Sequence, residues 1–409
     1  MNTNTMHAAA TKGTKKGPLP LEGITVVSLE HAIAAPFCTR QLADMGARVI
    51  KIERPGVGDF ARKYDERTRG MASHFVWTNR SKESLTLDLK HADAGPVLEQ
   101  LLAQADVLVQ NLAPGAAARM GLSFDALHAK FPKLIVCDIS GYGEGGPYET
   151  KKAYDLLIQS ESGFVSVTGS AEEPSKAGCS IADISAGSYA YSGILNALLL
   201  RHKTGLGSHL DVSMLESMVE WMSFPLYYAF EGAAPPPRAG ASHATIYPYG
   251  PFPVGDGNTI MLGLQNEREW KIFCDKVLLQ PELAGEARFA SNAKRSAARA
   301  ELSALILQAF ASLTAAQVAE RLETAGIANA QVNTMEEVWA HPQLKARGRW
   351  RQVETSAGAI PALLPPGSWQ HGEPRMDAVP ALGQHTDAIL SRYGYSAEAI
   401  AALREQGAV

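Results

Sequence analysis

The sequence predicts an α/β protein: a large doubly wound, Rossmann-like domain followed by a smaller α+β domain. Short apolar runs of strand length alternate with helical patterns between residues 24 and 139. A Pro-rich connector at 233–238 separates this region from a hairpin signal and a mostly helical segment. At 409 residues the chain is long enough to build more than one hydrophobic core.

The alternation of strands and helices in the first region is typical of a parallel sheet. The expected strands are 24–29, 47–53, 85–89, 107–111 and 134–139, and the expected helices between them are 35–45, 94–103 and 123–130. Helical patterns continue after Tyr154, at 185–204 and at 213–229. The last of these is rich in Met and aromatic residues, and we interpret it as a core or dimer-interface helix.

The smaller domain begins with a hairpin, in which strands at 252–254 and 259–263 flank the turn sequence GDGN. Helices are expected at 267–276, 293–312, 315–325 and 335–347, the last with a break at Pro342, and a strand at 327–332. The tail is expected to form strands and loops, followed by a helix at 396–406. The predicted organisation is a disordered leader at 1–20, the large domain at 21–235, the small domain at 236–345 and a return to the large domain at 346–409.

The composition favours a cytoplasmic protein that acts on small molecules. A net charge of −4 gives no reason to expect nucleic acid or an anionic membrane surface as a partner. The four cysteines are far apart and form no CxxC pair, which predicts reduced thiols rather than disulfides or a metal site. No apolar run approaches the length of a membrane span, and the leader lacks the apolar core of a secretion signal.

Basic and polar residues gather where the predicted strands end, which is where doubly wound sheets bind ligands. The common phosphate motifs GxGxxG and GxxxxGK[ST] are absent, and so is the hydrolase motif GxSxG. Taken singly, each polar residue is a surface charge or part of a plain turn. Together they place cations and free N–H groups on one rim, where a phosphate-bearing ligand would bind. These residues include Lys51, Arg54, Arg80, Lys82, Asn111, Arg119 and Tyr142.

One acid, Asp183, stands between a short apolar run and the helical pattern at 185–204. It is therefore expected just before or at a helix N-terminus. Unpaired N–H groups and the helix dipole would keep a carboxylate ionised there. Spacing alone leaves two interpretations open: a helix cap without chemical function, or a functional carboxylate.

Seven motifs follow one another along the chain: LEGITVV from Leu21, QLADMGARVIKIERP from Gln41, NRSKESLTLD from Asn79, NLAPG from Asn111, SGYG from Ser140, RHKTG from Arg201 and GQHT from Gly383. In this order they resemble the class III CoA-transferases, the CaiB/BaiF family. The resemblance runs from about residue 20 almost to the last residue of the sequence.

The resemblance implies a CoA-transferase in which Asp183 is the nucleophile. Asp183 would attack an acyl-CoA thioester, form an aspartyl anhydride and then an aspartyl-CoA thioester, and pass CoA to an incoming acid. No permanently bound cofactor or metal is implied, since the CoA thioester is a substrate. The family forms a homodimer of two interlinked ring-like chains. Its CoA contacts map onto Arg54, Arg80, Lys82, Asn111, Arg119 and Tyr142, and the turn nearest the thioester onto His31, Ala32, Ile33 and Ala34.

Two departures from the family pattern concern the ligand contacts. Some members have a glycine-rich loop over the active site, whereas the matching stretch here, 238–250, has only Gly240 and Gly250. Ser140 stands where one type of member has Lys. The resemblance therefore leaves open whether 238–250 acts as a lid and which cations meet the phosphates.

Two other functions remain as alternatives. An α-methylacyl-CoA racemase of the same fold needs two opposed proton carriers, and its His-Asp pair falls on Tyr154-Asp155. A tyrosine, with a pKa of about 10, replaces a histidine of about 6.5 poorly, which favours the transferase. A CoA-binding protein without chemistry is the second alternative, and turnover of any acyl-CoA and acid pair would exclude it.

The expected acids are small dicarboxylates such as succinate, itaconate, mesaconate, citramalate or glutarate. Cations near the site would suit the second carboxylate of such a substrate. The candidates are Arg62, Arg67, Arg69, His74 and His243, and a surface or structural role is the other interpretation of each. The sequence alone does not choose among the acids, nor between transfer from one molecule to another and transfer within one molecule.

Overall fold

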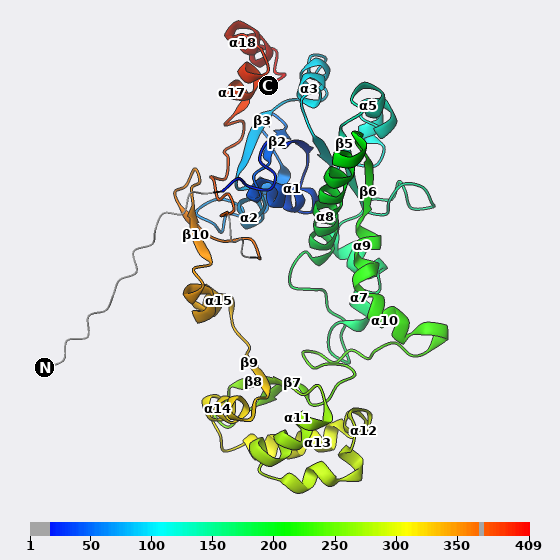
Figure 1. Ribbon diagram of the computed structural model, residues 1–409, viewed down its shortest axis with the longest axis vertical. Helices are drawn as coiled ribbons and strands as arrows, with labels where there is room; N and C mark the ends of the chain where they lie inside the picture. The colour runs from blue at the N-terminus through cyan, green and yellow to red at the C-terminus, as the bar shows by residue number, and fades with distance from the viewer. Residues whose placement is uncertain (1–16, 368–371) are drawn as a thin grey trace, which may run out of the picture. The chain divides into compact units, whose positions relative to one another are not determined.

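The computed structural model describes residues 17–367 and 372–409, coloured along the chain in Figure 1. Residues 1–16 of the predicted leader lie outside the described residues. The described chain forms two compact units: unit 1 is the described part of Met1–Asp155 with Ser180–Ser217 and Gly348–Val409, and unit 2 is Leu156–Cys179 with Met218–Arg347. From the sequence, 156–179 and 218–235 are expected in the large domain, whereas the structure groups both with unit 2.

Unit 1 is built on a six-stranded sheet in the order β3-β2-β1-β4-β5-β6, and every neighbouring pair is parallel. This is the doubly wound order, in which the winding direction reverses between β1 and β4. The predicted fold of the large domain is confirmed. The strands are β1 Thr25–Leu29, β2 Arg48–Glu53, β3 Lys82–Thr86, β4 Val107–Gln110, β5 Ile135–Ser140 and β6 His209–Ser213.

Two strands differ from the prediction. β3 begins at Lys82 and ends at Thr86, so most of the apolar run at 85–89 lies beyond the strand, and Leu87 packs into the core from the following loop. β6 is not predicted, because its mostly half-exposed residues, HLDVS, carry no apolar run. Edge strands of this kind give little hydrophobic signal.

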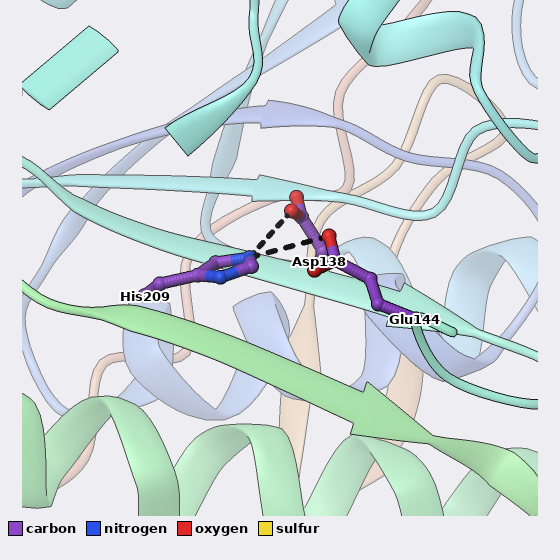
Figure 2. A group of neighbouring side chains, drawn as sticks. All are labelled: Asp138, Glu144 and His209. Carbon is purple, nitrogen blue, oxygen red and sulfur yellow. Dashed lines mark hydrogen bonds and ion pairs between the residues drawn. The ribbon is translucent and has the colours of Figure 1, made fainter. Parts of the chain in front are cut away.

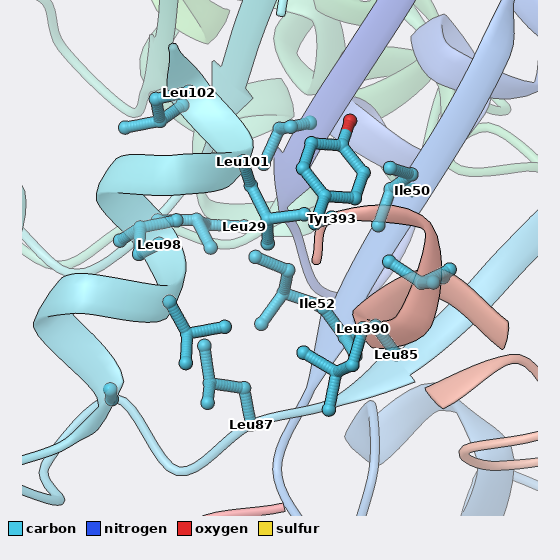
Figure 3. Close-up of a cluster of buried hydrophobic side chains, with 14 of the residues drawn as sticks. Leu29, Ile50, Ile52, Leu85, Leu87, Leu98, Leu101, Leu102, Leu390 and Tyr393 are labelled. Atoms are coloured by element: carbon cyan, nitrogen blue, oxygen red, sulfur yellow. The ribbon is translucent and has the colours of Figure 1, made fainter. Parts of the chain in front are cut away.

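Helices cover both faces of the sheet. α3 (Ala94–Leu102), α5 (Phe124–Lys130), α17 (Thr386–Arg392) and α18 (Ala397–Glu405) pack on one face, and α1 (Ala34–Asp44) and α8 (Ile181–Thr204) pack on the other. Figure 3 shows the buried cluster on the first face, which includes Leu29, Ile50, Ile52, Leu85, Leu87, Leu98, Leu101, Leu102, Leu390 and Tyr393.

Late residues of the chain close the β3 edge of the sheet. The Ser84 carbonyl accepts the N–H of His385 at 3.0 Å, and the Thr386 hydroxyl accepts the N–H of Thr86 at 3.0 Å. Just beyond the strand, the carbonyl of Ala408 accepts the N–H of Asp88 at 2.8 Å. α18 confirms the helix predicted at 396–406, whereas α17 lies in a tail predicted as strands and loops.

α8 begins four residues before the predicted helix, which places Asp183 in its first turn. One turn further on, Gly187 packs against the start of α1. A Cβ at Gly187 would stand 2.6 Å from the carbonyl oxygen of Ala34 and 3.0 Å from the ring of Phe37. Only a glycine permits this approach, so Gly187 sets how closely the first turn of α8 lies to the turn between β1 and α1.

Unit 2 carries an antiparallel sheet of β7 (Tyr249–Pro253), β8 (Thr259–Gly263) and β9 (Ala328–Gln331). The predicted hairpin and strand are therefore confirmed. α14 (Ala315–Ala325) has the predicted bounds. The single helix predicted at 293–312 is divided into two helices, α12 (Asn292–Ala297) and α13 (Arg299–Phe310). The core of the unit is built around Trp270, Phe273, Phe289 and Phe310.

Several smaller elements complete the described chain. The helix predicted at 213–229 breaks at Met222, and the helix predicted at 335–347 breaks before Pro342. The remaining elements are α2 Ser73–Asn79, α4 Ala116–Arg119, α6 Asp155–Glu161, α7 Phe164–Val167, α9 Met214–Trp221, α10 Ser223–Tyr228, α11 Glu267–Ile272 with a π-helical turn at Phe273–Val277, α15 Met335–Ala340, α16 Pro342–Ala346, the antiparallel pair β10 Trp350–Val353 and β11 Ile360–Leu363, and the short 3-10 turns Phe60–Lys63, Phe230–Gly232, Pro281–Gly285 and Ala287–Phe289.

In the described chain, no single helix has both the length and the apolar character of a membrane span. α13 and α14, which are bent by 110° relative to each other, meet these criteria only as a pair.

We expect Gly187→Ala to lower the melting temperature of the protein. Alanine is the better helix former by about 1 kcal/mol, yet its Cβ would force α8 away from the backbone of Ala34. Gly193→Ala is the matched control on the same helix, because its Cβ would meet only Leu210 methyl groups at 3.6 Å or more. The control should raise the melting temperature in circular dichroism. Equal stabilisation by both substitutions would contradict the close contact.

Candidate active site

A cavity of about 810 Å³ opens at the carboxyl ends of β1 and β4, where the strand order reverses. Its volume is in the usual range for small-molecule sites. All its lining residues belong to unit 1. They come from the last residues of several strands, from the segments that follow β1 to β5, and from the starts of α8 and α9 (Met214–Trp221). The structure thus places this cavity where doubly wound sheets bind ligands.

The turn between β1 and α1 forms one wall of the cavity, and all four predicted residues, His31, Ala32, Ile33 and Ala34, line it. Asn111 holds this turn from the end of β4. Its amide oxygen accepts the N–H of His31 and its amide nitrogen donates to the carbonyl of His31, both at 2.9 Å. Asn111 therefore lines the cavity and also fixes the main chain of the opposite turn.

Ala32 has a left-handed backbone, with φ at 61°. Such a conformation strains an L-residue and persists only where neighbouring groups enforce it. Here the Asp59 carboxylate accepts the N–H of Ala32 at 3.1 Å. Burial opposes the ionised form of Asp59, but the ammonium of Lys51 at 2.8 Å and the neighbouring hydrogen bonds hold the pKa of Asp59 well below its usual range. A permanent negative charge thus anchors the strained turn.

Asp183 lines the cavity from the first turn of α8. Gly187, one helical turn later, packs on the carbonyl of Ala34, so the start of α8 lies against the start of α1. The structure therefore brings Asp183 into one cavity with the predicted thioester turn, with Arg54 and with Asn111.

Asp155, at the start of α6, caps the N-terminus of α8. Its Oδ1 accepts the N–H of Ala182 at 2.8 Å and that of Asp183 at 3.3 Å. Ser180, the residue at the N-cap position, makes no side-chain cap. The segment that leads to Asp155 passes close to Gly141. A Cβ at Gly141 would stand 2.2 Å from the Cβ of Ala153, so the glycine leaves room for this segment.

Burial and the nearby carboxylate of Asp155 raise the pKa of Asp183 to about 7. The expectation that the helix N-terminus keeps Asp183 fully ionised is therefore wrong. Asp155 takes the first N–H groups of the helix, and the cavity wall removes water from the carboxylate. Near neutral pH the side chain exchanges between its acid and carboxylate forms, as perturbed groups in active sites often do.

Arg80 and Lys82 pair with buried acids and do not line this cavity. Arg80 is buried and donates two hydrogen bonds to Asp44, each of 2.8 Å. Lys82 is buried and donates to Glu30 at 2.7 Å and to the carbonyl of Pro36 at 3.0 Å. Burial lowers the pKa of Lys82 to about 8, although Glu30 opposes the shift. Neither side chain is among the described residues that line the cavity.

Arg119 and Tyr142 lie next to the cavity without lining it. Arg119 is exposed at the end of α4, between the lining residues Ala116 and Met120. The Tyr142 ring packs edge-on against Tyr148, and its buried hydroxyl finds no hydrogen-bond partner in the described structure. An orphaned hydroxyl of this kind costs about 1–3 kcal/mol unless another group binds it.

Three cations that line the cavity were not predicted from the sequence: Lys90, Lys151 and Lys152. Lys90 follows β3, and the other two lie in the segment after β5. The Nζ of Lys151 stands 4.2 Å from the ring centre of Tyr148 and 5.2 Å from that of Tyr142. Each of them follows the end of a strand, as Arg54 does. This position in the sequence is the signal that could have identified them.

Aromatic side chains form the wall beside His31. Phe60 stacks on the imidazole of His31 at 5.2 Å, and Tyr64 packs edge-on against His74 at 5.4 Å. Burial, together with the charges of Asp59 and Asp183, raises the pKa of Tyr64 to about 12, so its hydroxyl stays protonated.

Of the cations suggested for a second carboxylate, His74 lines the cavity. Arg62 instead pairs with Glu53 at 2.7 Å, and His243 lies in unit 2. Arg67 and Arg69 are exposed and are not among the described lining residues.

A second polar group joins β5, β6 and the loop after β5, on the β6 side of the sheet. Figure 2 shows Asp138 of β5, His209 of β6 and Glu144 from the loop after β5, whose potential ligand atoms all lie within 4.8 Å of one another. Both Asp138 oxygens already have partners, His209 at 2.8 Å and the amide of Gln110 at 2.8 Å. We therefore describe the group as a hydrogen-bonded link between strands.

Comparison with known proteins identifies the family. The model of CoA-transferase family III matches residues 21–386. Succinyl-CoA:glutarate CoA-transferase of Homo sapiens is 32% identical over 395 residues, covering 95% of this chain and 90% of that protein. Succinate–glutarate CoA-transferase of Agrobacterium fabrum is 33% identical over 349 residues, covering 83% and 87%. The crystal structure of a CaiB/BaiF family protein from Brucella suis superposes with a TM-score of 0.80 at 32% identity, covering 92% of this chain and 100% of that chain. The chain therefore belongs to CoA-transferase family III, as its motifs indicate, and is a CoA-transferase.

Proposed function

We propose that this enzyme moves CoA from an acyl-CoA to a carboxylic acid through covalent intermediates on Asp183. The observation that supports the proposal most directly is the position of Asp183, a partly shielded carboxylate in the wall of the strand-end cavity that the β1–α1 turn also lines. A carboxylate with a pKa of about 7 is more basic than an ordinary aspartate and still ionises near neutral pH.

The proposed steps balance as follows. An oxygen of ionised Asp183 bonds to the thioester carbon, the carbon–sulfur bond breaks, and CoA leaves as a thiolate. The thiolate attacks the aspartyl carbonyl of the resulting anhydride and releases the donor acid as a carboxylate. The acceptor carboxylate then attacks the aspartyl-CoA thioester, CoA leaves again, and its attack on the acceptor half of the second anhydride forms the new acyl-CoA and restores Asp183.

The charges of the cavity support a CoA thioester as the ligand. Arg54, Lys90, Lys151 and Lys152 line it and suit the phosphates of a nucleotide. In the first turn of α1, the N–H groups of Ala34 and Ala35 have no acceptor within the helix, and Ala34 lines the cavity. Such donors stabilise negative charge as it develops on a thioester oxygen.

We propose that the acids are small dicarboxylates. The relatives from Homo sapiens and Agrobacterium fabrum are named for succinate or succinyl-CoA and glutarate. In this chain, the imidazole of His74 and the hydroxyl of Tyr64 lie in the same cavity wall as His31 and offer polar contacts for a second carboxylate. Tyr64 would serve as a donor, because its raised pKa keeps the hydroxyl protonated.

Trapping tests the proposed intermediate. Enzyme mixed with succinyl-CoA and a panel of dicarboxylic acids is quenched with hydroxylamine or borohydride, and its peptides are weighed by mass spectrometry. The peptide with Asp183 should gain mass after hydroxylamine, which leaves a hydroxamate, and lose mass after borohydride, which leaves an alcohol. Asp183→Asn and Asp183→Ala should each lose activity by about a thousand-fold or more. Asp256→Asn, in unit 2, is the control and should keep its activity.

Three results would oppose these assignments. An unmodified Asp183 peptide during turnover would exclude the covalent route. Failure of every dicarboxylate to accept CoA would exclude the substrate class. Exchange of deuterium into the α-position of a single acyl-CoA, with no second acid present, would indicate a racemase instead.

A pair of arginine variants separates ligand binding from structure. Arg54→Ala should raise KM for acyl-CoA about ten-fold with little change in melting temperature, because Arg54 lines the cavity from an exposed position. Arg80→Ala should lower the melting temperature by several degrees, because it leaves the carboxylate of Asp44 buried with one partner fewer. Steady-state kinetics and thermal unfolding decide between the roles, and a reversed pattern would assign the CoA contact to Arg80.

We also propose that the chain forms a homodimer, as its resemblance to the family implies. α9, α10 and the turn after them expose a run of large apolar side chains, and such surfaces mark interaction sites. The run consists of Trp221, Phe224, Leu226, Tyr227, Tyr228 and Phe230. Light scattering should give twice the chain mass, and Phe224→Lys with Tyr227→Lys should reduce it. A wild-type mass of one chain would refute the proposal.

A further inference from the structure

Asp155 is a cavity residue that the proposed reaction steps do not use. It stands at the start of α6, and its Oδ1 accepts the N–H groups of Ala182 and Asp183 at 2.8 and 3.3 Å. Asp155 and Asp183 both line the cavity. A carboxylate from another part of the chain therefore takes the place that the N-cap side chain Ser180 leaves unfilled.

This arrangement has an electrostatic consequence for Asp183. The first N–H groups of a helix stabilise a nearby negative charge, and an aspartate in the first turn ordinarily gains from them. Here two of these donors point to Asp155, and its charge opposes the ionisation of Asp183. Asp155 thus holds the main chain of Asp183, and the Asp183 carboxylate does not gain the usual stabilisation from these N–H groups.

Other titratable groups share the cavity wall with Asp183 and contribute to its field. Apart from burial, the carboxylate of Asp155 is the group that raises the pKa of Asp183. The other titratable and charged groups of the wall are His31, Glu53, Arg54, Tyr64, His74, Asp88, Lys90, Lys151, Lys152 and Tyr154. Asp59 lies just behind the wall, with its carboxylate 3.8 Å from Nδ1 of His31.

We propose that Asp155 is a positioning residue for CoA transfer: its carboxylate holds the first turn of α8 at the cavity and makes Asp183 a stronger base and nucleophile. This inference rests on the proposed function. It also gives Tyr154-Asp155 a role other than the proton-carrier pair of a racemase, because an oxygen of Asp155 already accepts two main-chain N–H groups.

The inference fixes the sign of the pH dependence. Asp183 attacks only as a carboxylate, so the rate of acyl transfer to it should fall as pH drops through about 7. Removing the charge of Asp155 should lower the pKa of Asp183. The fall in rate at low pH, which is the acid limb of the pH–rate profile, should then move to lower pH by about one unit. The same change should slow the reaction on the alkaline plateau, because a less basic carboxylate is a weaker nucleophile.

Two neutral capping residues test this effect without removing the cap. Asp155→Asn and Asp155→Ser each keep an oxygen that can accept the helix N–H groups. The rate of aspartyl-CoA formation is measured in a single turnover between pH 5 and 9, with hydroxylamine as the trap. Both variants should show the acid limb about one unit below that of wild type and a lower plateau. Asp155→Glu keeps the charge and should keep the position of the limb.

Asp256→Asn is a matched control for loss of a capping charge. Asp256 accepts the N–H of Ala315 at 3.0 Å and so caps α14 in unit 2. Its substitution should leave the limb unchanged. If one neutral variant of Asp155 does not fold, the other decides the outcome together with Asp155→Glu.

An unshifted acid limb in the neutral variants, with Asp183 still modified in every protein, would overturn the role of Asp155 and leave the proposed function intact. An unmodified Asp183 in wild-type enzyme during turnover would instead overturn the proposed function. A purely structural cap would reduce the rate equally at every pH, and this result also counts against the inference.

Discussion

Two lysines enclosed between the sheet and α1 set the constraint on which the cavity depends. Lys51 and Lys82 are buried, and charges in such a place are tolerated only when they are paired. Lys51 pairs with Asp59 at 2.8 Å, and Lys82 pairs with Glu30 at 2.7 Å. Asp59 then holds the N–H of Ala32 in the strained turn. The shape of the cavity wall therefore follows from charge pairing in the layer beneath it.

The main elements of the fold and the position of Asp183 at a helix start could be predicted from the sequence because their signals are local, whereas the nucleophilic role proposed for Asp183 rests on the family resemblance. Apolar runs marked five of the six strands, and helical spacing placed Asp183 near a helix start. The roles of Arg80 and Lys82 could not be predicted in this way. A basic residue beside a strand end can point to a ligand or into the layer under a helix, and only the packing of α1 decides between the two. The contact of Asp155 with α8 could not be predicted either, because it joins residues that are 27 positions apart in the sequence.

The close packing of the start of α8 has two opposing effects: it brings Asp183 to the cavity, and it removes water from the Asp183 carboxylate. α8 must lie close to the start of α1 for Asp183 and the β1–α1 turn to line one cavity, and Gly187 provides that approach. Close packing also removes water from the carboxylate, which raises its pKa. Ionising Asp183 in the folded protein consequently costs free energy at alkaline pH that an unfolded chain does not pay. Reactive groups in enzymes commonly carry such a penalty in stability.

The closure of the β3 edge links the sheet to the order in which a ribosome makes the chain. β3 ends at Thr86, yet the groups that cover its edge and the following loop lie at His385, Thr386 and Ala408. Throughout most of translation this strand has an uncovered edge, and uncovered edges pair readily with other chains. All of unit 2 has been synthesised by the time His385 emerges. All six strands of the sheet are thus made before most of unit 2, whereas the groups that cover its β3 edge are made after unit 2, and until then this edge is open to pairing with other chains.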